Sequence, residues 1–151
     1  MRLPLRQSLA MMAAALWWGS LTGLGFVVVP LLFKHLGNPA TAGAMAAKLF
    51  TAQTWLSVAC AMSMLLAFNK KDDPTLAPYA ATAMKFIVAG LLLALLVEFG
   101  VAPRIVSVRA EGGNLRLWHG LGSAMYFGQW LCAGFTLWRL ARRSRSFPPP
   151  A

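Results

Sequence analysis

The sequence predicts an all-α membrane protein, a four-transmembrane-helix bundle with both termini cytoplasmic, and three observations point to it. Of the 151 residues, 58% are hydrophobic and only 12% are charged, and the mean hydropathy is +0.61. A soluble domain of this length cannot bury so much apolar surface in one core, whereas lipid accommodates it. The apolar residues fall into four runs, each long enough for a spanning helix, which needs about 20 apolar residues. Basic residues flank these runs, and few charges interrupt them.

The first predicted span covers residues 9–33 and holds no charged residue. Two arginines before it raise the alternative of a cleaved signal peptide. The apolar stretch before the alanines at 13–15 is too short for the apolar region of such a peptide, and the run continues well past them. We therefore expect an uncleaved helix that Pro30 kinks or ends.

The remaining predicted spans cover residues 45–68, 79–102 and 117–140. Turn-forming residues separate them: Asn38-Pro39 before the second, prolines on both sides of the third and Gly112-Gly113 before the fourth. Together the spans form one domain, residues 1–140. Residues 141–151 are basic and end in prolines, so we expect a disordered cytoplasmic tail there.

Four spans place both termini and the middle loop on one side of the membrane. That side would hold eight lysines and arginines and the other side four: Arg2, Arg6, Lys70, Lys71, Arg139, Arg142, Arg143 and Arg145 against Lys34, Arg104, Arg109 and Arg116. The positive-inside rule therefore predicts cytoplasmic termini, in what we expect to be a bacterial cytoplasmic (inner) membrane. The net charge of +10 fits this topology and contact with anionic lipid. Because the basic residues never form one stripe, we expect no nucleic-acid partner.

Polar residues near the outer ends of three predicted spans indicate a polar site at the outer mouth of the bundle. Lys48, Glu98 and His119 each fall within about 5 Å of the outer boundary at a rise of about 1.5 Å per residue. Ionisable residues inside spans are costly and are functional candidates. We expect Glu98 to pair with Lys48 or to hold the imidazole of His119; the alternative is a structural ion pair with Lys48 snorkelling outward. Arg116 and His35 lie just beyond, at the same boundary.

Two further patterns predict how the helices meet. Gln53, Ser57, Cys60 and Met64 recur on one face of the second span, which is typical of a helix contact, with the lining of a path as the alternative. Small residues four positions apart predict close backbone approach within the bundle rather than between copies of the chain. With Pro30 they make up the predicted packing positions: Gly19, Gly23, Pro30, Gly120, Ala124 and Gly128.

The sequence offers little for catalysis or for a cofactor. It has no nucleophile-plus-base pattern and no glycine-rich phosphate loop, and only four acidic residues. A haem with two axial histidines, or a histidine-rich copper site, would need both His119 and His35, and His35 falls in a predicted loop. We therefore expect no metal and no cofactor. Cys60 and Cys132 fall at similar depth, and a soft-metal site there is the alternative.

The order of short motifs along the chain resembles that of a known family. These motifs are Trp17-Trp18-Gly19-Ser20, Val29-Pro30-Leu31-Leu32-Phe33, Ala46-Ala47-Lys48-Leu49-Phe50 and Trp118-His119. Over residues 9–140 the chain resembles the transmembrane protein 205-like family, also called domain of unknown function 4149. The resemblance implies four spans and no defined biochemical activity, and it adds Ser123, four residues after His119, to the candidate polar site.

Three kinds of function follow from these features. The favoured one is a non-enzymatic accessory, resistance or assembly factor with a polar site at the outer mouth. The alternatives are a metal- or haem-linked redox subunit that uses His119 and Glu98, and a small transporter that would need to oligomerise. The expected partners are the lipid bilayer and either a second copy of the chain or another membrane protein.

Overall fold

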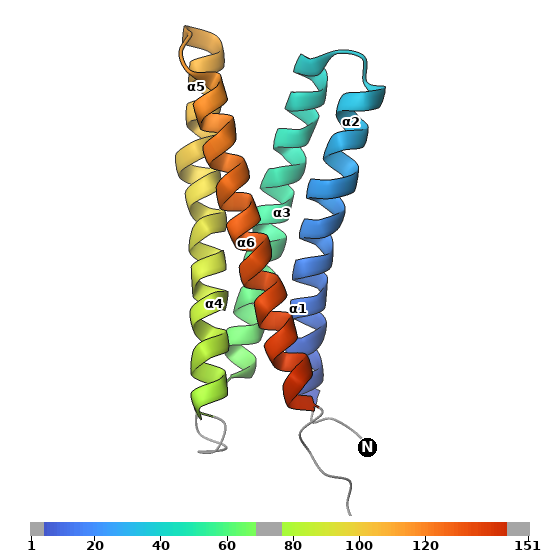
Figure 1. The fold of residues 1–151 in the computed structure, drawn as a ribbon, viewed down its shortest axis with the longest axis vertical. Coiled ribbons are helices and arrows are strands. Elements are labelled where there is room, and N and C mark those ends of the chain that lie inside the picture. The colour runs from blue at the N-terminus through green and yellow to red at the C-terminus, as the bar shows by residue number, and fades with distance from the viewer. Residues whose placement is uncertain (1–4, 69–76, 145–151) are drawn as a thin grey trace, which may run out of the picture.

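The computed structural model describes residues 5–68 and 77–144, which form helices joined by short turns and contain no strand. The predicted all-helical fold is confirmed. One continuous helix comprises α1 (Leu5–Gly23), the π-helical turn η1 (Leu24–Val28) and α2 (Val29–His35). It is followed by α3 (Pro39–Ala67). A second continuous helix comprises α4 (Ala77–Leu96), the π-helical turn η3 (Val97–Val101) and α5 (Ala102–Glu111), and α6 (Leu115–Ser144) completes the fold (Figure 1).

Three of these helices are long and apolar enough to cross a membrane: Leu5–His35, Pro39–Ala67 and Ala81–Glu111. The last helix, α6, has 30 residues and is equally long, but arginine, histidine and glutamine side chains make it less apolar. The protein is thus a candidate integral membrane protein by its helices. The fourth span and the placement of the termini stay predictions.

Three helix boundaries differ most from the predicted spans. The second helix begins at Pro39 instead of residue 45, because Asn38 caps it: its Oδ1 accepts from the Ala40 amide at 2.8 Å, and Pro39 suits the first helical position. The third helix continues past Pro103 to Glu111, whereas we predicted that it would end at residue 102. The last helix runs to Ser144, past the predicted limit at residue 140, and the tail beyond Ser144 lies outside the described residues.

Both interior prolines are tolerated in the same way. Pro30 lies two residues after η1, and Pro103 lies two residues after η3. A proline has no amide hydrogen, and its ring clashes with the carbonyl four residues earlier, which belongs to Phe26 in one helix and to Phe99 in the other. A wider π-helical turn on the N-terminal side absorbs this mismatch, so the helix continues instead of ending.

The helices form two hairpins that separate toward one end. The helix α1–α2 packs along α3, and α4–α5 packs along α6, while α1 also contacts α6 and α3 contacts α4. Figure 1 shows that α2 and α3 diverge from α5 and the start of α6 at the end that carries the turns 36–38 and 112–114. We call this the turn end and the opposite end the terminal end.

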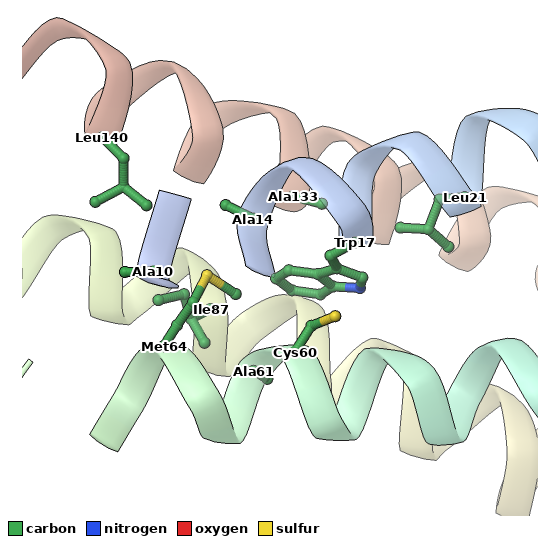
Figure 2. Packing of buried hydrophobic residues seen from close by; sticks show 10 residues of the cluster. All are labelled: Ala10, Ala14, Trp17, Leu21, Cys60, Ala61, Met64, Ile87, Ala133 and Leu140. Carbon is green, nitrogen blue, oxygen red and sulfur yellow. The ribbon is translucent and has the colours of Figure 1, made fainter. Parts of the chain in front are cut away.

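An apolar cluster fills the terminal half of the bundle around Trp17 (Figure 2). Its members come from four helices and are all buried: Ala10, Ala14, Trp17, Leu21, Cys60, Ala61, Met64, Ile87, Ala133 and Leu140. The indole of Trp17 lies so close to α4 that a Cβ at Gly90 would be 2.7 Å from its Cη2 atom. Only glycine at position 90 lets the ring occupy this place without a shift.

Candidate functional site

His119 and Ser123 lie near the turn end of α6, where other helices do not cover the inner side of this helix as they do further along it. His119 is seven residues before Tyr126 and fourteen before Ala133, so the three side chains project from nearly the same side of the helix. Ala133 is fully buried and Tyr126 is half-buried, whereas His119 and Ser123 are exposed. Their exposure coincides with the divergence of the hairpins (Figure 1). His119 therefore lies on the inward stripe of α6 beyond the point at which α1 covers it, and Ser123, one turn later, lies beside that stripe.

Glu98 joins the two hairpins, but with a partner other than the expected ones. It lies in η3, is half-buried, and its Oε1 accepts a hydrogen bond from Thr51 Oγ1 of α3 at 2.8 Å. Within the described ranges, no ion pair joins Glu98 to Lys48 or His119. Sequence reasoning missed Thr51. Its hydroxyl, one turn after Lys48 at the same end of the helix, could have been recognised as a possible partner of Glu98.

Lys48 projects away from the bundle. It is nine residues before the buried Ser57, and at about 100° per residue this places the two side chains on opposite faces of α3. Its side chain is exposed. This placement agrees with the snorkelling alternative. His35 and Arg116 are also exposed at the turn end, and the structure records no contact that draws them to Glu98.

Arg109 of α5 reaches across the turn end to the other hairpin. One of its guanidinium nitrogens would lie 3.3 Å from a Cβ built at Gly43 of α3. The order of the predicted spans places this residue on the outer side, but it was not part of the predicted site. Together, the Thr51–Glu98 hydrogen bond and this contact are two links between the hairpins near their open end.

An aromatic pair lies just inward of His119 and Ser123. The ring of Tyr126 meets the ring of Phe50 edge-on, with 5.2 Å between centroids. The hydroxyl of Tyr126 donates to the backbone carbonyl of Leu21 at 2.8 Å. Tyr126 and Phe50 therefore connect α6, α1 and α3 where the hairpins come together.

One turn further inward, four polar side chains form a buried group that we call the polar layer: Ser20, Gln53, Ser57 and Gln129. Gln53 Nε2 donates to Ser20 Oγ at 2.9 Å and to Ser57 Oγ at 3.4 Å. Gln129 Nε2 donates to the same Ser57 Oγ at 2.9 Å. Ser57 is fully buried, and both glutamines are less than one-tenth exposed. Side chains of α1, α3 and α6 thus meet through hydrogen bonds in the middle of the bundle.

The predicted polar face of the second helix is confirmed. Its four members, Gln53, Ser57, Cys60 and Met64, are all buried. Gln129 and Ser20 were missed, although a glutamine in the middle of an apolar run is itself a signal, because a polar side chain at that depth needs a partner.

The small-residue pattern marks fewer contacts than predicted. A Cβ at Gly128 would lie 3.2 Å from Leu93 of α4, but in the described part of the chain nothing lies within 4 Å of a Cβ at Gly19, Gly23 or Gly120. The close approaches occur instead where a glycine faces an aromatic ring. Among residues 5–68 and 77–144, no group of three or more His, Cys, Asp or Glu could hold a metal ion.

A known family covers most of the chain before α6. The family model described as Domain of unknown function (DUF4149) matches residues 12–114. The chain belongs to this family. The match covers both π-helical turns, both interior prolines, Lys48 and Glu98, and it ends before α6, so His119 and Ser123 lie outside it. No curated protein matches the chain, and no solved structure matches it. Kinship with transmembrane protein 205 stays a prediction.

Proposed function

We propose that this DUF4149 protein is a non-enzymatic accessory factor of the bacterial cytoplasmic membrane, with four spans, cytoplasmic termini and a polar site at its outer mouth. One observation carries the proposal: His119 is exposed on the stripe of α6 that is buried further inward, with the exposed Ser123 beside it. Polar side chains on an inward stripe, at the open end of a bundle, are available to a partner or ligand that enters between the hairpins.

The packing of α6 supports a fourth span. Because α6 packs along α4 and α1, it shares the depth of two helices that are apolar enough to span. Its surface away from the bundle carries the exposed apolar side chains Leu121, Phe127 and Leu131, as a lipid-facing surface would. With α6 in the membrane, the terminal end holds both termini, and its excess of basic residues favours the cytoplasm.

The mouth suits binding more than catalysis. It offers an imidazole, a serine hydroxyl and the hydrogen-bonded Thr51–Glu98 pair, on two different hairpins. A molecule that bridged His119 on one hairpin and Thr51 on the other would hold the hairpins at a fixed separation. An accessory or assembly factor could use such a contact to sense or to hold its partner.

The test combines topology and substitution. A C-terminal fusion to a reporter that works only in the cytoplasm should be active. Activity of a C-terminal reporter that works only outside the cytoplasm would reverse the proposed orientation. His119→Ala/Ser123→Ala should lose a partner that wild-type protein cross-links in membranes, and should fail to rescue a deletion strain. Ser63→Ala removes an exposed helical serine far from the mouth and is the control. Rescue by the double variant, with the same cross-linked partners, would contradict the proposed site.

A further inference from the structure

Side chains change character in layers along the inner surface of the bundle. From the turn end inward, α6 presents His119 and Ser123, then Tyr126, then Gln129, and then Ala133 of the apolar cluster. On α3, Phe50 pairs with Tyr126, and Ser57 Oγ accepts hydrogen bonds from both Gln53 and Gln129. The polar layer thus lies between an aromatic pair on one side and the apolar cluster around Trp17 on the other.

The hydrogen bonds within the polar layer leave some of its donors and acceptors unused. Ser57 Oγ donates to the Gln53 carbonyl and accepts from both glutamine amides, and Ser20 Oγ donates to the Trp17 carbonyl and accepts from Gln53. Each glutamine side chain also carries an oxygen that can accept, and Gln129 Nε2 has a second hydrogen to donate. No donor among the described residues is recorded for either oxygen.

Trp17 supplies the strongest indication of a ligand. Its side chain is fully buried, and its Nε1 has no hydrogen-bond partner in the described part of the chain. Figure 2 shows Nε1 at the edge of the indole that faces Leu21, above Cys60. Ser57 is one turn from Cys60 and toward the turn end, so this edge faces the polar layer. Buried indole N–H groups are rarely left unpaired.

We propose that the polar layer binds a small neutral molecule with a hydroxyl group, water being the smallest, which accepts from Trp17 Nε1 and donates to a glutamine oxygen. Neutrality follows from the lining, because the layer holds amides, hydroxyls and an indole but no charged side chain that could balance an ion. The ligand both accepts and donates because the unused groups include N–H donors and oxygen acceptors. The Tyr126–Phe50 pair separates the site from the turn end, and the ligand enters when these rings move.

The experiment uses full-length protein in lipid nanodiscs, with ¹⁵N-labelled tryptophan indoles. Trp130 is the internal control, because its Nε1 donates to Thr22 Oγ1 at 2.9 Å. The Trp17 indole, assigned through Trp17→Phe, should show a cross-peak to water. It should exchange its hydrogen about fivefold to tenfold faster than Trp130, because the ligand that accepts from it can leave, whereas Thr22 stays in place. One hydrogen bond of ordinary net strength contributes a factor of this size to protection. Adding glycerol separates the two ligand sources: a saturating shift of the Trp17 signal assigns a polyol, and an unchanged water cross-peak assigns water.

Substitutions in the polar layer complete the test. Ser57→Ala/Gln129→Leu should abolish the ligand signal at Trp17 and leave the Trp130 signal in place, which also reports that the bundle is folded. Ser63→Ala, which removes a serine hydroxyl from the exposed face of the same helix, should change nothing. Absence of both water and glycerol signals at Trp17 in the wild-type protein would overturn the proposal, as would signals that the double substitution leaves unchanged. The proposal does not depend on His119 or Ser123, so either site can fail alone.

Discussion

The hydroxyl of Tyr126 donates to the backbone carbonyl of Leu21 at 2.8 Å, and its ring lies against Gly25, where a Cβ would be 2.7 Å from Cε1. Leu21 and Gly25 are four residues apart, so in an uninterrupted α-helix the Leu21 carbonyl would accept from the Gly25 amide. A side chain from α6 therefore enters the backbone ladder of the first helix where η1 begins. Together with Pro30, this contact accounts for the π-helical turn, since an inserted group and a proline each disturb the ladder.

Removal of this hydroxyl by Tyr126→Phe is expected to destabilise the protein by about 1–3 kcal/mol, the usual cost of leaving a buried polar group without its partner. The measurement is unfolding in mixed micelles with increasing denaturing detergent. Ser63→Ala is the matched control, because the one bond recorded for that hydroxyl within residues 5–68 and 77–144 goes to the Ala59 carbonyl of its own helix, on an exposed face. Equal stability of the Tyr126→Phe variant and the wild type would show that the hydroxyl does not hold the turn.

The glycines of the first helix offer a paired test of how closely Tyr126 approaches it. A Cβ at Gly25 would lie 2.7 Å from Tyr126 Cε1, whereas nothing in the described residues lies within 4 Å of a Cβ at Gly23. Gly25→Ala should therefore cost about 1–3 kcal/mol through overpacking, while Gly23→Ala should be neutral or slightly stabilising because alanine favours a helix. Thermal unfolding of both variants in one detergent gives the comparison. If both lost the same stability, the ring would not lie against Gly25.

The helices could be predicted from the sequence because lipid demands long apolar runs, and the described helices include each predicted run at its place in the chain. Their ends were harder to predict. Pro103 and the polar residues after it indicate a loop, yet η3 lets the helix continue to Glu111. A π-helical turn depends on a tertiary contact or on the way a proline is absorbed, and hydropathy carries neither.

The predicted site and the structure differ in both depth and direction. Rise per residue predicts Lys48, Glu98 and His119 at one depth, but Glu98 bonds to Thr51, which follows Phe50, and Phe50 pairs with Tyr126, seven residues inward of His119 on α6. Rotation around α3 turns Lys48 away from the bundle. The partner of Glu98 depends on how its helix is rotated relative to α3. Residue spacing within one helix does not predict that rotation. The face of Gln53 and Ser57 was predictable because all its members share one helix.

The Thr51–Glu98 hydrogen bond can be tested against the ion pair that the sequence suggested. In a double-mutant cycle, Thr51→Val and Glu98→Leu should show a coupling of about 0.5–1.5 kcal/mol, as expected for one hydrogen bond to a carboxylate near the surface. Lys48→Met is the comparison, because it should show no coupling with Glu98→Leu. Stability toward denaturing detergent supplies each free energy. A larger coupling through Lys48 than through Thr51 would restore the ion-pair interpretation.

The contact between Trp17 and Gly90 predicts a non-additive pair. Gly90→Ala would place a Cβ 2.7 Å from Trp17 Cη2 and 3.1 Å from Cys132 Cβ, so we expect a loss of about 1–3 kcal/mol. Gly100→Ala is the matched control, since nothing in the described residues lies within 4 Å of a Cβ there. Trp17→Phe alone leaves a cavity and is destabilising. In the double variant, however, the phenyl ring no longer reaches the new methyl group, which fills part of that cavity. The combined loss should therefore be smaller than the sum of the two single losses, and strictly additive losses would show that the indole does not lie against Gly90.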